Sequence, residues 1–153
     1  MANGKKVYAQ IRKVLDKMDW KYTPHDDDLV ISSGIKSDDL PIEFLIVVND
    51  DKEIIQYYSK LPFSMPEDKR VDGAIVVAVA NYGMVNGSFD YDINDGEIRF
   101  RLTQSYVDAL PSQEFIEYMI GVSSNTVDAY NDKFFMVAKN MLSVSDFIKK
   151  ENE

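Results

Sequence analysis

The clearest alternation of polar and apolar positions lies between residues 86 and 102, on both sides of the pair Asp95-Gly96. Alternation is typical of strands with one buried face, and Asp-Gly favours a two-residue type I′ turn. With this pair at the tip, apolar residues face apolar ones and aspartates face arginines: Ile93–Ile98, Asp92–Arg99, Tyr91–Phe100, Asp90–Arg101 and Phe89–Leu102. A tip one residue earlier would place Asp92 opposite Glu97 and put the faces out of step. We therefore predict a hairpin with an aromatic face in the core and an Asp/Arg face in water.

Apolar residues at helical spacing predict three helices. The first spans residues 3–18 and begins at a candidate Asn cap. The second opens at residues 64–67, which have the Ser-x-x-Glu spacing of a capping box. The third covers residues 112–141, and the stretch 121–125 is where it would kink or break. Ser143 restarts a short terminal turn.

The second helix is apolar around most of its circumference. One stripe at helical spacing contains Val71, Ala74, Ile75, Ala78, Val79 and Tyr82. Further apolar residues lie off this stripe, so we expect the helix to be buried on more than one side, with the C-terminal helix or a second subunit on its back. The predicted partner or dimer surface consists of five residues: Val76, Val77, Ala80, Trp20 and Tyr57.

Three strands are predicted between the first two helices, at residues 29–35, 42–48 and 53–59. Polar turn clusters precede and separate them, including residues 36–41. With the hairpin, the order is α-β-β-β-α-β-β-α. This order indicates an α+β fold in which a mostly antiparallel five-stranded sheet packs against helices. We expect residues 1–153 to form a single domain.

Composition narrows the function classes. The chain of 153 residues has no cysteine, which excludes disulfides, thiolate nucleophiles and Cys-based zinc sites. A net charge of −9 argues against a nucleic-acid surface. The longest apolar run, residues 74–80, is too short to cross a bilayer, and residues 1–15 do not resemble a signal peptide. We expect a cytoplasmic protein that binds neither membranes nor nucleic acid.

Two groups of residues suggest metal binding, and for each a simpler interpretation is favoured. His25 precedes three aspartates, but consecutive loop residues cannot all converge on one ion, so a solvated loop is preferred. Asp90, Asp92 and Asn94 have the spacing of an EF-hand loop. That loop requires Gly at its sixth position and Glu at its twelfth, where this chain has Asp95 and Arg101. We expect no metal and no cofactor.

The candidate catalytic and binding groups also have simpler interpretations. The hairpin carboxylates could form a catalytic pair, but the predicted register already pairs two of them with arginines. No Gly-x-Ser-x-Gly elbow accompanies the single histidine, and we expect no enzymatic activity. A set of aromatic residues could line a binding groove or belong to core and rim: Trp20, Tyr22, Tyr57, Tyr58 and Phe63.

Several short motifs carry a family resemblance. They are Leu61-Pro62, Pro66-Glu67, Lys69-Arg70, Asn81, Gly87, Phe89, Asp92, Asp95-Gly96-Glu97, Ile98-Arg99 and Arg101, with weaker support from Thr126, Asp128 and Tyr130. On these residues the chain resembles the YbjN family, also described as bacterial sensory transduction regulators, which is similar in fold to type III secretion chaperones. The resemblance implies small, acidic, non-enzymatic proteins that act through protein contacts. It further implies a homodimer, with peptide segments wrapping the sheet and the first helix.

The sequence therefore favours a protein-binding or regulatory module of chaperone-like fold, homodimeric, with an unidentified protein or peptide partner. The alternative is a small-molecule-sensing domain with a pocket between the sheet and the C-terminal helix.

Overall fold

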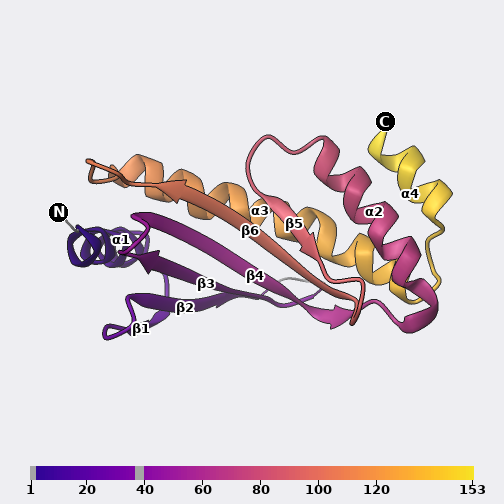
Figure 1. Cartoon of the computed structure of the whole chain (residues 1–153), viewed down its shortest axis with the longest axis horizontal. Coiled ribbons are helices and arrows are strands. Elements are labelled where there is room, and N and C mark those ends of the chain that lie inside the picture. The colour runs from indigo at the N-terminus through magenta and orange to yellow at the C-terminus, as the bar shows by residue number, and fades with distance from the viewer. Residues whose placement is uncertain (1–2, 37–39) are drawn as a thin grey trace.

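A six-stranded antiparallel sheet, covered by helices on one face, forms the body of the molecule (Figure 1). The computed structural model describes residues 3–36 and 40–153. The strands lie in the order β1-β2-β3-β4-β6-β5. The elements are α1 (Gly4–Lys17), β1 (Tyr22–His25), β2 (Val30–Ile35), β3 (Ile42–Asn49), β4 (Ile54–Ser64), η1 (Glu67–Lys69), α2 (Arg70–Tyr82), β5 (Ser88–Tyr91), β6 (Glu97–Ser105), α3 (Gln113–Ala138) and α4 (Val144–Glu151).

The α+β class is confirmed, but the sheet has six strands rather than five. The additional strand is β1, which pairs with β2 at the sheet edge. Its sequence contains Pro24 and little apolar alternation, which is why the sequence predicts no strand before residue 29. Proline is tolerated on an edge strand because one side of that strand needs no hydrogen-bond donor. The turn predicted at residues 36–41 falls largely on 37–39, which lie outside the described residues.

The core lies between the sheet and the helices α1 and α3. In β3 the buried residues alternate with outward-facing ones, as the period of two in a strand requires. Its buried side chains are Ile42, Phe44, Ile46 and Val48. Helix α3 is continuous from Gln113 to Ala138, so the stretch 121–125 does not break it.

Two helix starts follow the same serine pattern. The Oγ atom of Ser112 accepts a hydrogen bond from the backbone N of Phe115 at the start of α3. Ser143 does the same for Asp146 at the start of α4. The restart predicted at Ser143 is therefore confirmed.

The predicted hairpin is present, but the register predicted for it is wrong by two residues. The structure pairs Phe89 with Phe100, Asp90 with Arg99 and Tyr91 with Ile98. Asp92 therefore does not lie opposite Arg99, and Tyr91 does not lie opposite Phe100. This is the register that the sequence argument rejected, with Asp92 opposite Glu97. The faces stay in step in it, because a slip of two residues leaves every side chain on its own side of the sheet.

A longer turn explains the shift. Gly96 has a φ of +79°, whereas Asp95 does not take the positive φ that a type I′ turn requires. The backbone N of Gly96 donates to Asp92 O at 2.7 Å, and the backbone N of Asp92 donates to Glu97 O at 3.0 Å. The Asp92 carboxylate also accepts from the backbone N of Asn94. The aspartates thus stabilise a four-residue loop rather than a two-residue tip.

Helix α2 also differs from the prediction, at its start and in its orientation. Ser64 is the last residue of β4 and pairs with Glu97, so it does not cap the helix, which begins at Arg70 after η1. The face with Val76, Val77 and Ala80 points into the core. Of the stripe that was predicted to be buried, Val71, Ile75, Ala78 and Tyr82 are exposed on the outer face, whereas Val79 is partly buried against the core.

Close packing against β5 fixes this orientation of α2. A side chain at Gly73 would collide with Tyr91, whose hydroxyl donates to Arg70 O. The Asn81 amide bonds both backbone groups of Phe89, accepting from its N at 2.8 Å and donating to its O at 2.9 Å. The side chain of Asn81 thereby occupies the free edge of the sheet, which would otherwise be open to strand pairing.

The hairpin geometry predicts that Gly96→Ala lowers the free energy of unfolding by about 2 kcal/mol or more. The added Cβ would be held at positive φ and would collide with the backbone of Met65, which bonds Gly96 O. Urea unfolding measures the loss. Gly83→Ala is the matched control, because nothing lies within 4 Å of a Cβ at Gly83. Equal effects of the two substitutions would contradict the proposed turn geometry.

Candidate functional site

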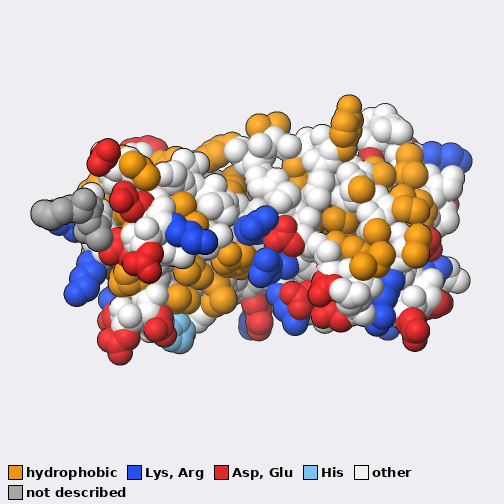
Figure 2. Space-filling view, viewed as in Figure 1, with side chains coloured by type: hydrophobic (Ala, Val, Ile, Leu, Met, Phe, Trp, Pro, Cys, Tyr) orange, Lys and Arg blue, Asp and Glu red, His pale blue; other side chains and the backbone are white. Residues whose placement is uncertain are grey.

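The face of the sheet opposite the helices is uncovered and carries the candidate site. Figures 1 and 2 view the molecule from this side, where hydrophobic side chains lie over the middle of the sheet with charged ones beside them. Leu45 on β3 is 42% exposed. Val47 and Tyr58, on β3 and β4, are half-buried neighbours of it on the same face. Three large apolar side chains thus lie in contact with solvent near the centre of the sheet.

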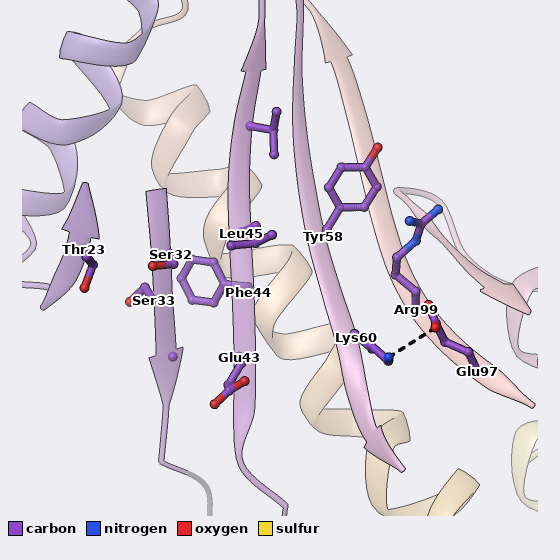
Figure 3. A pocket seen from close by; sticks show the side chains of 12 residues that line it. Thr23, Ser32, Ser33, Glu43, Phe44, Leu45, Tyr58, Lys60, Glu97 and Arg99 are labelled. Carbon is purple, nitrogen blue, oxygen red and sulfur yellow. Dashed lines mark ion pairs between the residues drawn. The ribbon is translucent and has the colours of Figure 1, made fainter. Parts of the chain in front are cut away.

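These side chains belong to a shallow groove of about 910 Å³. Figure 3 shows Leu45 in its middle, Tyr58 and Arg99 on one side, and Thr23 and Ser32 on the other, with α3 behind the sheet. Gly34 contributes no side chain to the lining. The groove therefore has an apolar floor with polar groups on both sides.

The wall formed by β4 and β6 carries charged side chains of both signs. The Arg99 guanidinium lies 4.7 Å from the centre of the Tyr58 ring, within the range of a cation–π contact. The same guanidinium lies 3.0 Å from the Asp90 carboxylate, and Arg101 lies 3.3 Å from that carboxylate. The Asp90 carboxylate therefore pairs with both guanidinium groups. Lys60 pairs with Glu97 at 3.3 Å.

The single histidine of the sequence, His25, lies next to the opposite wall of the groove, where it contacts the lining residue Ser32. The Nε2 atom of His25 lies 3.1 Å from the Oγ of Ser32, across β1 and β2. A catalytic serine–histidine pair needs a third group that orients the imidazole. The neighbouring Asp26 instead accepts hydrogen bonds from Tyr8 at 2.8 Å and Arg12 at 3.1 Å. Burial and the bond to Asp26 raise the pKa of Tyr8 to about 12. This network ties α1 to the turn between β1 and β2.

Most residues of the predicted partner surface lie inside the subunit, which corrects that prediction. Val76, Val77 and Ala80 form the inner face of α2. Tyr57 is fully buried, and its hydroxyl lies 3.0 Å from the Oγ of Ser124 on α3. Burial raises the pKa of Tyr57. Trp20 is partly buried against the core.

Of the predicted aromatic groove, only Tyr58 lines the open face. Trp20 packs edge-on against Phe44, and Phe63 packs edge-on against Phe135. These contacts join core and rim and do not form a shared groove. The signal for the groove was present in the strands, because outward-facing positions of β3 and β4 carry Leu, Val and Tyr where a solvated face would carry polar residues.

The prediction of a pocket between the sheet and the C-terminal helix is also wrong. Side chains from both sides fill this space, including the fully buried residues Tyr57, Phe100, Ile116, Met119, Ile120 and Val127. A small molecule would have to displace this packed core. The small-molecule-sensing hypothesis is therefore not supported at the site predicted for it.

Within residues 3–36 and 40–153, no group of three His, Asp or Glu side chains is placed to hold a metal ion. Asp90, part of the EF-hand-like spacing, binds two arginines instead. Over the same part of the chain, no helix is long and apolar enough to cross a membrane.

Comparison with known proteins assigns the fold. The model of the YbjN family, described as "Putative bacterial sensory transduction regulator", matches residues 8–136. The crystal structure of YbjN from E. coli is similar, with a TM-score of 0.64 and 11% identity, over 86% of this chain and 92% of that one. The ExsC–ExsE complex contains a chain with a TM-score of 0.63 and 9% identity, over 86% of this chain and 96% of that one. No curated protein sequence matches this chain.

The register of the hairpin predicts which charges are coupled. In a double-mutant cycle, Asp90→Ala and Arg99→Ala should show a coupling energy of about 0.5–1 kcal/mol, because the two groups form a partly exposed ion pair. The cycle of Asp92→Ala with Arg99→Ala is the control and should show no coupling. Urea unfolding of the single and double variants measures both. Coupling of Asp92 rather than Asp90 to Arg99 would restore the register predicted from sequence.

Proposed function

This chain belongs to the YbjN family, and we propose that it is a non-enzymatic protein-binding module that acts as a homodimer in the cytoplasm. In this proposal a segment of a partner protein lies in the groove on the uncovered face of the sheet. The bound segment occupies the groove. The identity of the bound partner protein then determines the regulatory effect.

The observation that carries the proposal is the apolar floor of the groove. Leu45, Val47 and Tyr58 lie together on a sheet face that no helix of the described chain covers. Apolar side chains gain free energy when they leave water, at roughly 25 cal/mol per Å² of buried surface. A partner segment that covers these side chains would bind through this gain, and the polar groups at the groove margins would align it.

The charges beside the groove favour a particular kind of segment. In the groove lining Lys60 and Arg99 are balanced by Glu43 and Glu97, whereas Arg99 and its neighbour Arg101 share the single carboxylate of Asp90. The chain as a whole has a net charge of −9 and repels acidic proteins at a distance. The best match is a segment with apolar anchors and one carboxylate near them, from a partner that is not itself strongly acidic.

The comparison structures support protein binding by this fold. One of them is a complex of two proteins, ExsC and ExsE. The similarity concerns the fold alone at 9% identity, so the position and chemistry of the groove are argued from this chain's own residues.

Site-specific photo-crosslinking tests the proposal. A benzoylphenylalanine at Leu45 should form an adduct with a partner protein in cells, because Leu45 lies in the groove floor. The same crosslinker at Val107 is the control, since Val107 is 56% exposed on the loop after β6 and is not a lining residue of the groove. The captured protein is then purified and its affinity measured.

For the purified partner, Leu45→Asp should weaken binding roughly tenfold or more, because it places a charge in the apolar floor. Val107→Asp should leave the affinity unchanged. Equal capture at both positions, or full affinity of the Leu45→Asp variant, would show that the groove does not bind the partner.

A further inference from the structure

The loop between α2 and β5 contains the dipeptide Asn86-Gly87. Because glycine has no Cβ to shield its backbone nitrogen, that nitrogen can approach the side-chain carbonyl carbon of the preceding asparagine. Both residues are half-buried and lie outside the helices and strands. Asn86 lines a second groove, of about 790 Å³, between this loop and one face of α3. The loop therefore holds a side-chain amide within reach of its own backbone and of solvent.

The backbone nitrogen of Gly87 is free to react. Within residues 3–36 and 40–153 it makes no hydrogen bond. The dipeptide Asp95-Gly96 is the natural comparison, because its side-chain carbonyl carbon is open to the same attack. There the backbone N of Gly96 donates to Asp92 O at 2.7 Å, and the Asp95 carboxylate accepts from the backbone N of Glu97 at 2.9 Å. Both reacting groups of that second dipeptide are thus held in hydrogen bonds, so the structure favours reaction at Asn86.

The nitrogen that would leave Asn86 lies beside a proton donor. Its Nδ2 atom donates to the hydroxyl oxygen of Tyr118, on α3, at a distance of 2.6 Å. In the described part of the chain, the hydroxyl hydrogen of Tyr118 has no acceptor of its own. An amide nitrogen leaves a carbon atom more readily when it is protonated as the bond breaks, and a tyrosine hydroxyl at this distance can supply the proton.

From these observations we propose that Asn86 is a self-modification site, at which the folded protein deamidates with the help of Tyr118. The backbone N of Gly87 loses its proton to solvent and bonds to Cγ of Asn86. The Cγ–Nδ2 bond then breaks, and the nitrogen takes the hydroxyl proton of Tyr118 and leaves as ammonia. Tyr118 regains a proton from water. A further water molecule opens the resulting succinimide ring, adding OH to one carbonyl carbon and H to the nitrogen, which gives aspartate or isoaspartate at position 86.

The reaction changes a region that carries no charge. Residues 73–89 and 118–127 contain no Asp, Glu, Lys or Arg, although such residues make up 28% of the sequence. A carboxylate at position 86 makes this region less suited to apolar contacts, because covering a charge with apolar surface costs free energy. Isoaspartate also lengthens the backbone by one methylene next to Gly87, which packs so closely on the Phe100 ring that a Cβ there would collide with it.

Peptide mass spectrometry of the folded chain, incubated at mildly alkaline pH, tests the proposal. The peptide with residue 86 should gain about 1 Da over time, and methylation by an isoaspartyl methyltransferase should detect the isoaspartate fraction. Tyr118→Phe should slow the reaction roughly tenfold, because it removes the proton donor. Tyr82→Phe is the matched control and should react like the wild type, since Tyr82 is 93% exposed and does not line the groove. Asn86→Gln should stop the reaction, because its longer side chain would have to close a larger ring.

The same incubation in urea separates the effect of the fold from that of the sequence. Asn86 should react at least as fast in the folded chain as in urea, whereas Asp95 should form isoaspartate only in urea, where its hydrogen bonds are lost. A folded chain in which Asn86 stays intact while the unfolded chain reacts would overturn the proposal. Equal rates for Tyr118→Phe and the wild type would overturn the role of Tyr118.

Discussion

The arrangement of the whole molecule depends on the burial of one face of the sheet under α1 and α3. The inward side chains of β3, β4 and β6 form a continuous core with α3, and the hydrogen bond of Tyr57 to Ser124 lies within it. A single long helix crosses the sheet behind β4 and β6. Because all this packing occurs on one side, no helix within residues 3–36 and 40–153 covers the other side of the sheet.

The candidate groove follows from this one-sided arrangement. The outward residues of a sheet that faced only water would be polar, yet this sheet has Leu45, Val47 and Tyr58 there. Helix α2 packs at the β5 edge of the sheet through Gly73 and Asn81, which directs its second apolar face outward. The same fold therefore exposes one surface suited to a partner segment and a second apolar surface on α2.

The sequence predicted the elements better than their relative orientation. Strong alternation and helical spacing identified the class, the three main helices and the two faces of the hairpin. The hairpin register could not be recovered because a slip of two residues preserves those faces, and the side chain of Asp92 favours the longer loop. The orientation of α2 was ambiguous because both of its faces are apolar. Gly73 was the available signal, since a residue without a side chain marks the face in closest contact.

The candidate site was harder to predict than the fold. Aromatic residues such as Tyr57 and Tyr58 are adjacent in sequence, but strand geometry sends one into the core and the other to the open face. Once the pairing of β3 with β4 is known, that alternation assigns each residue to its face. Before the pairing of the two strands is known, the same residues can be interpreted equally well as core residues or as groove residues.

The most direct measurement of the central claim is hydroxyl-radical footprinting of the protein alone and in complex with its native partner. The structure predicts that oxidation of Leu45 and Tyr58 falls on binding, because the partner segment covers the floor of the groove. Val107 should be oxidised equally in both samples, since it lies outside the groove. Unchanged oxidation of Leu45 and Tyr58 in a fully formed complex would contradict the assignment of the uncovered sheet face as the binding surface.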